Sequence, residues 1–266
     1  MSFKISVLAS GSTGNAIYIE SDSTRLLLDS GLSLKKLEEA LSEIGRLASQ
    51  LDAVLISHEH GDHILGVGVL HRKHKTPIYG NEATLTCAEF NKKVGKLADD
   101  ALHFIDHDES VVIGDIEVNA FGTSHDSAKA QFYTFEHDGK KIACVTDTGY
   151  VSEKIEQVIK SSNVFLIESN HDVEMLLAGE RPWSNKQRVL SDRGHLSNED
   201  SAIVTARVID ENTHSVILAH LSRDNNLEDL ALMNMNSYLA DNRGDVFDNL
   251  QIIAAKPNAV TDLIEV

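Results

Sequence analysis

The chain has 266 residues, of which 42% are hydrophobic and 24% are charged, a composition typical of a globular protein with a substantial core. It contains no apolar run of the roughly 18 residues that a membrane helix needs, and its first residues are too polar for a secretory signal. The formal net charge of −17 excludes long-range attraction to nucleic acid, so any such contact must use a local basic patch. We expect a cytoplasmic protein that contacts no membrane, with Cys87 and Cys144 as unbridged thiols.

Short runs of β-type residues dominate the first half of the chain, at Lys4–Leu8, Ala16–Glu20, Arg25–Asp29 and Ala53–Ser57. A helix is predicted between the last two runs, because apolar residues recur there at helical spacing. Ser33 is its predicted N-cap and Gly45 its predicted end. A further helix is predicted over Ile64–His71.

Two turns with strands on both sides mark the middle of the chain. One is at Gly114-Asp115, and the other, at Asp138-Gly139, is a strong hairpin signal. The elements predicted after them are the helix Ser152–Ser161, the strand Val164–Glu168, a helix capped by Ser197 and Asp200, the strand Val216–Ala219, the helix Leu227–Leu239 and the strand Gln251–Ala254. The chain has no repeat or low-complexity linker, so we predict one domain over residues 1–266. Its class is α/β (α+β), a four-layer αββα sandwich of two mixed sheets flanked by helices.

A dense group of metal-binding side chains follows the strand Ala53–Ser57, in the tract His58-Glu59-His60-Gly61-Asp62-His63. Four such ligands within six residues converge only if the loop folds around cations. Imidazole nitrogens with one carboxylate suit zinc, or manganese or iron as the share of oxygen ligands rises.

The tract resembles the metal-binding signature of the metallo-β-lactamase fold, and the other motifs of that superfamily follow in order. The run Leu26–Gly31 resembles the strand whose terminal aspartate, here Asp29, supports the metal-binding loop without binding a metal ion itself. His125, Asp147 and His220 each follow a predicted strand and match the remaining ligand positions.

This resemblance implies two divalent metal ions, zinc in the first place and manganese or iron as alternatives. The expected ligands are His58, His60 and His125 for one ion, Asp62, His63 and His220 for the other, and Asp147 as the bridge between them. A hydroxide that bridges the two ions is then the expected nucleophile of a hydrolase. Asp62 is counted among the catalytic residues as well as among the ligands.

The choice of substrate depends on residues outside the ligand set. The run Gly194-His195-Leu196-Ser197 resembles the His-x-Ser/Thr element of the nuclease branch. His195 is therefore the expected catalytic residue that stabilises charge on a phosphate or protonates the leaving oxygen. Ser197 and Asn198, at a helix N-terminus, are expected to contact the substrate anion. A simple helix cap beside an exposed histidine is the alternative.

Over nearly its full length the chain is similar to one subgroup, the YycJ/WalJ-like proteins of bacteria. The landmarks of this similarity are Ala9–Asn15, Thr123–Asp126, Glu168–Asp172, Gly194–Asn198 and Ala219–Asn226. That family is associated with DNA exonuclease activity on duplex ends and with a cell-wall regulatory operon. The similarity therefore implies a phosphodiesterase, most specifically a DNA exonuclease.

Three further residues are candidates for substrate binding. Ser12 and Asn15 lie in a loop of small residues whose backbone amides could approach an anion, although a plain turn explains the loop equally well. His171 follows a strand and a carboxylate, and structural and functional interpretations of it are equally supported.

The acidic net charge predicts a small nucleic-acid footprint, at a DNA end or on a short single strand. The basic residues expected to contribute are Arg181, Lys186, Arg188 and Arg193. The alternatives are a hydrolase of small esters, thioesters or lactones, a tRNA 3′-processing endonuclease, a regulatory binding module and a di-iron redox protein. The sequence leaves the oligomeric state open.

Overall fold

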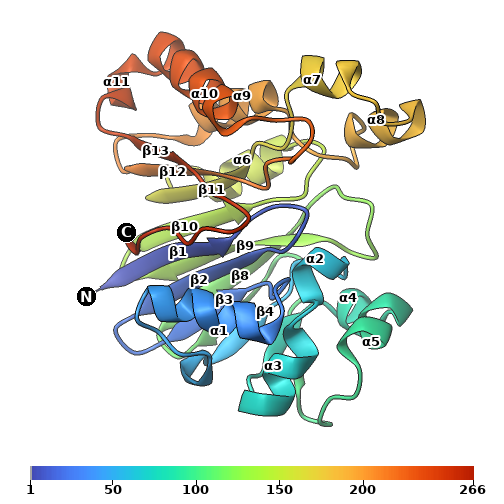
Figure 1. The fold of residues 1–266 in the computed structure, drawn as a ribbon. Coiled ribbons are helices and arrows are strands. Elements are labelled where there is room, and N and C mark those ends of the chain that lie inside the picture. The colour runs from blue at the N-terminus through green and yellow to red at the C-terminus, as the bar shows by residue number, and fades with distance from the viewer. Residues whose placement is uncertain (1) are drawn as a thin grey trace. The chain divides into compact units, whose positions relative to one another are not determined.

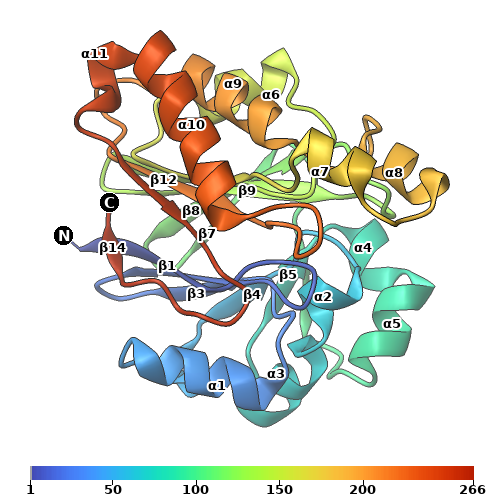
Figure 2. The same cartoon turned by 45° about the horizontal axis from the view of Figure 1, so that its top comes forward.

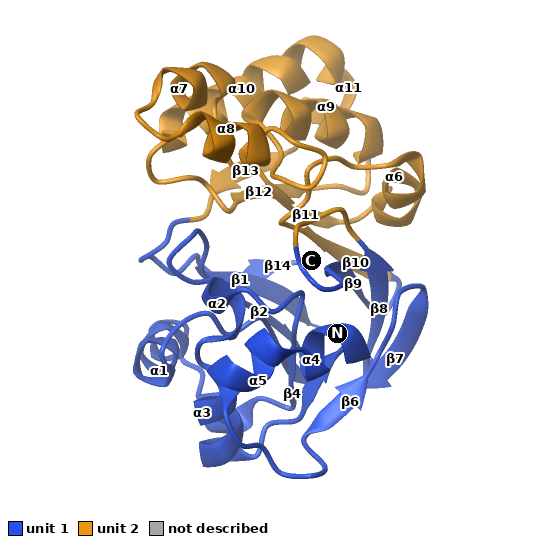
Figure 3. Ribbon diagram, turned by 90° about the vertical axis from the view of Figure 1, so that its right-hand side faces the viewer, with its two compact units in different colours: residues 1–122, 127–139, 256–266 blue, residues 123–126, 140–255 orange. Residues whose placement is uncertain are grey.

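A computed structural model describes residues 2–266, which fall into two compact units (Figure 3). Unit 1 contains the residues up to 122 together with 127–139 and 256–266. Unit 2 contains residues 123–126 and 140–255. The single domain over residues 1–266 stays a prediction.

Unit 1 contains a seven-stranded mixed sheet with the strand order β14-β1-β2-β3-β4-β5-β6. Its strands are β1 (Phe3–Ala9), β2 (Ala16–Ser21), β3 (Arg25–Leu28), β4 (Ala53–Leu55), β5 (Ile78–Gly80), β6 (Leu102–Phe104) and β14 (Ile264–Glu265). Strands β3 and β4 are parallel, with Leu28 opposite Leu55. Their carboxyl ends therefore lie at one edge, which places Asp29 beside the segment that leads into the histidine tract.

The second sheet also has seven strands, in the order β13-β12-β11-β10-β9-β8-β7. Three of them, β7 (Glu109–Ile113), β8 (Ile116–Gly122) and β9 (Gln131–His137), belong to unit 1 and pair antiparallel. Unit 2 contributes the parallel strands β10 (Lys140–Val145), β11 (Val164–Glu168), β12 (Ser215–Ala219) and β13 (Gln251–Ala254). Because β10, β11 and β12 run parallel, the polar residues at their carboxyl ends meet at one edge of unit 2.

Helices accompany the sheet strands of both units (Figure 1). Those of unit 1 are α1 (Leu34–Glu43), α2 (Gly61–Ile64), α3 (Val67–His74), α4 (Glu82–Thr86), α5 (Ala88–Val94) and the single 3₁₀ turn η1 (Ala48–Gln50). Those of unit 2 are α6 (Glu153–Ile159), α7 (Val173–Ala178), α8 (Trp183–Val189), α9 (Asn198–Val208), α10 (Glu228–Asn242) and α11 (Gly244–Phe247). Helices α9 and α10 pack side by side (Figure 2). No helix within residues 2–266 is long and apolar enough to cross a bilayer.

The local signals at the predicted helix ends and turns are confirmed. The Ser33 side chain accepts a hydrogen bond from the backbone N–H of Lys36, and Gly45 ends the turn after α1 with φ of 69°. Asp138 and Gly139 have φ values of 50° and 74°, as a tight hairpin turn requires.

The helix predicted over Ile64–His71 is wrong in its extent, because the chain breaks at Gly66 into α2 and α3. The Gly66 N–H donates to the carbonyl of Ser30 at 2.7 Å. A Cβ at Gly66 would lie 2.2 Å from the carbonyl oxygen of Leu32. This close backbone contact forces the break and holds the tract against the chain that follows β3.

Candidate metal centre

In unit 1, the carboxylate of Asp29 anchors the histidine tract. It is buried and accepts hydrogen bonds from the Ser57 backbone N–H at 2.9 Å and the Ser57 hydroxyl at 2.8 Å. It also bonds Nδ1 of His63 at 2.7 Å. Because Nδ1 donates to this carboxylate, the ring of His63 presents the lone pair of Nε2. The structure thus brings Asp29 and His63 into direct contact.

The other members of the tract converge on the same place. Nε2 of His58 and Nδ1 of His60 are 3.0 Å apart, and a carboxylate oxygen of Asp62 lies 3.7 Å from Nε2 of His63. Two imidazole nitrogens bound tetrahedrally to one zinc ion are about 3.3 Å apart, given Zn–N distances of about 2.0–2.1 Å. The spacing of His58 and His60 therefore suits two ligands of one cation.

The loop that contains Asn15 packs directly on this tract. The Asn15 backbone N–H donates to the carbonyl of Asp62 at 2.8 Å, and its side-chain nitrogen lies 3.1 Å from Nε2 of His63. Gly31 allows this close packing, because a Cβ there would lie 1.6 Å from the Asp62 carbonyl oxygen. Ser12, in the same loop, is exposed.

In unit 2, the site is organised by Glu168, a residue that the sequence analysis did not place in it. Its Oε1 bonds Nδ1 of His195 at 2.7 Å and Nδ1 of His220 at 2.8 Å. Its Oε2 accepts the backbone N–H of Thr148 at 3.0 Å and that of Leu196 at 3.3 Å. The sequence showed only that Glu168 ends a buried strand, and this alone does not place it beside His220.

Glu168 is fully buried, and burial alone would raise its pKa. The charge of His195 and the hydrogen bonds from His195 and His220 outweigh that effect and hold the pKa of Glu168 well below its ordinary value. The group is therefore an ionised carboxylate that fixes both imidazole rings.

The predicted bridging residue, Asp147, lies within this cluster. Its Oδ1 is 3.4 Å from Nδ1 of His220, 3.8 Å from Nδ1 of His195 and 3.9 Å from Nε2 of His125. Asp147 and His220 both have φ of 56°, an unfavourable backbone conformation that costs a non-glycine residue about 1–3 kcal/mol. Such a cost at two strand ends indicates that the orientation of these side chains matters more than local stability.

Three loops of unit 2 are linked by buried asparagines. The Asn170 side chain donates to the carbonyl of His220 at 2.8 Å. Asn198 and Asn226 bond each other through their amides, and the Ser169 hydroxyl donates to Asn198 at 2.6 Å. These residues belong to the runs that carried the family resemblance. Their contacts fix the loops that hold His195 and His220.

Ser197 and His171, two predicted substrate contacts, have well-defined surroundings. The Ser197 hydroxyl accepts the backbone N–H of Asp200 at 3.0 Å, which confirms the predicted cap of α9. His171 is 1% exposed, its carbonyl accepts the backbone N–H of Asn198, and neither ring nitrogen has a partner within residues 2–266. Burial is the main reason why the pKa of His171 is lowered, so the ring is neutral.

The basic side chains predicted to contact DNA make protein contacts. Arg181 pairs with Asp224 at 2.5 Å, and Arg188 donates hydrogen bonds to both carboxylate oxygens of Asp126, at 2.5 and 2.9 Å. Lys186 is buried, with its ammonium donating to the carbonyls of Leu177 and Gly179. Arg193 donates to the carbonyl of His125 at 3.3 Å.

The two half-sites are the cluster around Asp29 in unit 1, with His58, His60, Asp62 and His63, and the cluster around Glu168 in unit 2, with His125, Asp147, His195 and His220. They share the same chemistry. Each collects imidazole nitrogens and carboxylate oxygens at the carboxyl ends of strands, and in each a buried carboxylate sets the ring orientation. In unit 2, side-chain nitrogen or oxygen atoms of Asp147, Glu168, His195 and His220 that could bind a metal ion all lie within 4.8 Å of one another. This donor set fits divalent metal ions.

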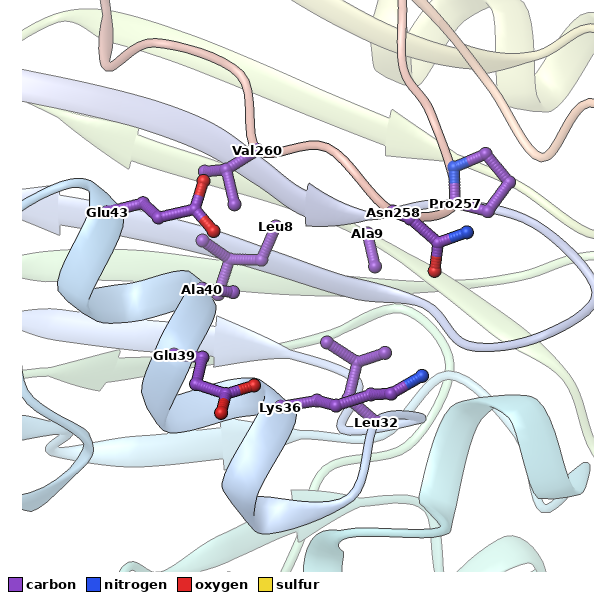
Figure 4. A pocket seen from close by; sticks show the side chains of 10 residues that line it. All are labelled: Leu8, Ala9, Leu32, Lys36, Glu39, Ala40, Glu43, Pro257, Asn258 and Val260. Atoms are coloured by element: carbon purple, nitrogen blue, oxygen red, sulfur yellow. The ribbon is translucent and has the colours of Figure 1, made fainter.

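A separate cavity of about 120 Å³ lies in unit 1, between α1 and the segment after β13 (Figure 4). Leu8, Leu32 and Ala40 form its apolar part, and the carboxylates of Glu39 and Glu43 lie beside it. None of the predicted site residues lines it.

A family model described as a beta-lactamase superfamily domain matches residues 24–221, which include every expected metal ligand. Exodeoxyribonuclease WalJ of Streptococcus pneumoniae (strain D39) is 44% identical over 264 residues, covering 99% of this chain and 98% of its own length. Exodeoxyribonuclease YycJ of Bacillus anthracis is 43% identical, with 99% of both chains covered.

The fold of the chain resembles solved structures of much lower identity. The metallo-beta-lactamase fold protein YhfI of Bacillus subtilis superposes with a TM-score of 0.70 at 17% identity, covering 98% of this chain and 99% of its own. This likeness, together with two mixed seven-stranded sheets flanked by helices, confirms the predicted fold class.

Proposed function

We propose that this chain, which belongs to the metallo-β-lactamase superfamily and within it to the family of the WalJ and YycJ proteins, is a metal-dependent phosphodiesterase that acts as a DNA exonuclease. One observation carries the proposal beyond the resemblance. His195, which is outside the expected ligand set, shares the buried carboxylate of Glu168 with the expected ligand His220. A histidine held in this way beside the ligands supports phosphodiester cleavage.

The proposed centre holds two divalent ions. The ligand sets are those implied by the resemblance: His58, His60 and His125; Asp62, His63 and His220; and Asp147 between them. The local geometry of each half-site and the match of the family model across residues 24–221 support this assignment. When bound, such ions lower the pKa of water toward neutrality and offset the charge of a phosphate. Zinc is the first choice, because imidazole nitrogens predominate.

The protein's own residues complete the chemistry. Nδ1 of His195 donates to Glu168, so Nε2 is the ring atom that can give a proton to the leaving oxygen of the sugar. The His195 side chain is 13% exposed, against 5% for His220 and 1% for His125, so it is the more accessible ring. His220 is held through Nδ1 by the same carboxylate, and its Nε2 would be the atom available to hold a metal ion.

DNA ends or short single strands are the proposed substrates, in accord with the acidic net charge. Ser12, Asn15 and His171 are the proposed substrate contacts. For Ser197 and Asn198, also predicted to contact the substrate, the proposed role is to position α9 and the His195 loop through their hydrogen bonds with Asp200, Ser169 and Asn226. A cytoplasmic location is part of the proposal, and the absence of a disulfide between Cys87 and Cys144 is consistent with it.

The test is to incubate the metal-loaded protein with labelled duplex DNA, single-stranded DNA, a tRNA precursor and a thioester. We expect progressive cleavage of DNA from an end. His195→Ala should lower kcat by roughly 100- to 10,000-fold while the bound metal, measured by atomic emission, is unchanged.

His103→Ala is the matched control, because that histidine is exposed and outside both half-sites. Cleavage of the thioester alone would show that the nuclease assignment is wrong. Loss of metal from His195→Ala would make His195 a ligand rather than a proton donor.

A further inference from the structure

The single tryptophan of the chain is unusually exposed. Trp183 is the first residue of α8, in the segment between His171 and His195, and 59% of it is accessible to solvent. Among residues 2–266, only Phe104 and Tyr150 are comparably exposed aromatics, at 55% and 48%. So large an exposed apolar ring contributes little to folding and is accessible to a partner.

The segment that contains Trp183 is held firmly in place. The Lys186 ammonium closes the turn between α7 and α8 by donating to the carbonyls of Leu177 and Gly179, at 2.7 and 2.6 Å. Arg188 is bound through two nitrogens to Asp126, the neighbour of His125 in the chain. The tryptophan is therefore fixed on a short helix that is bonded to the margin of the unit 2 half-site.

We propose that Trp183 is a stacking platform for a base near the end of a DNA strand while that end lies in the metal centre. This inference rests on the proposed nuclease function and adds the residue that holds the strand. A base stacked on an exposed aromatic ring is a sequence-tolerant contact, as removal of successive nucleotides requires.

Charge on the same segment is compatible with a DNA partner. From Arg181 to Arg193 there are four basic residues and one acidic residue, a net charge of 4 − 1 = +3. The rest of the chain then carries −17 − 3 = −20. The stretch that exposes the tryptophan is thus a local exception to an acidic chain, and it stays less repulsive to a polyanion than the rest of the chain even though Asp224 and Asp126 pair with two of its arginines.

The contacts of those basic groups limit how they can bind. Arg181, Lys186 and Arg188 are occupied by protein partners, so few of them are available to replace counterions on phosphates. Binding should consequently depend on stacking more than on phosphate contacts, and its dependence on salt should be shallow. Tyr150, on the loop that follows Asp147, is a second exposed aromatic ring of unit 2.

The only tryptophan of the chain is also the probe for the experiment. Metal-loaded protein is titrated with a short duplex whose terminal linkages are phosphorothioates, while Trp183 emission and iodide quenching are followed. We expect the emission to fall and the ring to become protected from iodide, in proportion to the DNA bound as measured by anisotropy.

Substitutions then separate stacking from charge. Trp183→Ala should weaken DNA binding by roughly 5- to 150-fold with an unchanged slope of log Kd against log salt, and Trp183→Phe should retain most of the affinity. KM for DNA should rise in parallel, while cleavage of a dinucleotide changes little. Phe104→Ala is the matched control, because it removes an equally exposed ring from unit 1.

Several outcomes would overturn the inference. Unchanged Trp183 emission at saturating DNA would do so, as would an unaltered KM in Trp183→Ala. Loss of a dimer from Trp183→Ala in sedimentation would show instead that the ring contacts a second copy of the chain. If the wild-type protein cleaves no DNA at all, the proposed function fails, whereas normal cleavage with an indifferent Trp183 overturns this inference alone.

Discussion

Both units hold histidines on a buried carboxylate, but the two carboxylates differ in what they hold. In unit 1, Asp29 bonds one ring, that of His63, and its remaining hydrogen bonds come from Ser57. In unit 2, Glu168 bonds two rings, those of His195 and His220, and two backbone N–H groups. One carboxylate supports a single expected ligand, and the other joins an expected ligand to the proposed proton donor.

The difference indicates that the two units contribute differently to the proposed centre. The unit 1 tract is a compact ligand set within six residues, and it needs only one support from outside. The unit 2 cluster is assembled from separate strand ends and loops, so one carboxylate and a network of asparagines must hold these segments in fixed positions. Damage at Glu168 should therefore affect metal binding and proton transfer together, whereas damage at Asp29 should affect metal binding alone.

The largest expected effect follows from Glu168→Gln. The amide oxygen would keep the backbone N–H groups of Thr148 and Leu196, so the amide NH₂ would face Nδ1 of His195 and His220, where it cannot accept their protons, and the negative charge between the two rings would be lost. Loss of metal affinity by about 10- to 100-fold and of proton transfer by about 100-fold or more should lower kcat/KM for DNA at least about 1,000-fold.

Steady-state cleavage and metal titration measure the two parts of this effect separately. Glu211→Gln is the control, since it neutralises an exposed glutamate of the same unit. Full activity once Glu168→Gln is saturated with metal would contradict a role in proton transfer.

A smaller effect is expected from Asp29→Asn. Asparagine tolerates the φ of 60° found at this position, so the backbone can be kept while the carboxylate is removed. Metal affinity should fall about 10- to 100-fold because His63 loses its orienting partner, and kcat should recover at saturating metal. Calorimetric titration with zinc checks this, with the exposed Asp52→Asn as control. An unrecovered kcat would mean that Asp29 and Glu168 have equivalent roles.

The same comparison explains how much of the site could be predicted from sequence. The tract from His58 to His63 is local, so spacing and chemistry were enough to identify it as metal-binding. Glu168 could not be identified in that way, because its role depends on β11 lying beside β12 in parallel register, with Glu168 opposite Ala219. Strand order is a non-local property that a single sequence does not display.

Short elements were the other limit of the sequence analysis. Helices α4, α5, α7 and α8 have five to seven residues each, too few to show a helical period. Two of them form the segment that contains Trp183. The sequence shows the basic residues of that segment, but their pairing with Asp126, Asp224 and backbone carbonyls depends on tertiary contacts.

Glu20 in unit 1 is a further buried carboxylate, and it lies outside the proposed centre. Removing its partner tests whether the loss of a buried ion pair anywhere in unit 1 lowers zinc affinity as Asp29→Asn does. Burial acts to raise the pKa of Glu20, but hydrogen bonds from Arg46, at 2.6 Å, and Tyr18, at 2.8 Å, outweigh it and lower the pKa. Because the folded-state pKa is lowered, Glu20 stabilises the fold above its ordinary pKa of about 4.3, and this stability is lost as the pH falls through the lowered value.

Arg46→Ala should reverse that dependence. Without the guanidinium, burial, the largest single effect on this carboxyl, should raise the pKa of Glu20 despite the hydrogen bond from Tyr18, so the variant should be least stable at neutral pH and regain part of its stability as the pH falls through the raised pKa. The free energy of unfolding at pH 7 should fall by about 2–3 kcal/mol, less than for a fully buried pair because the Arg46 side chain is 28% exposed.

Urea unfolding between pH 4 and 8 measures this change, and the paired variant Arg46→Met with Glu20→Gln should restore stability at neutral pH. DNA cleavage and zinc affinity at pH 7 should stay within about twofold of the wild type in all of these variants, because no site residue contacts the pair. A loss of zinc affinity comparable to that of Asp29→Asn would mean that Asp29 acts through the stability of unit 1 and not through the ring of His63.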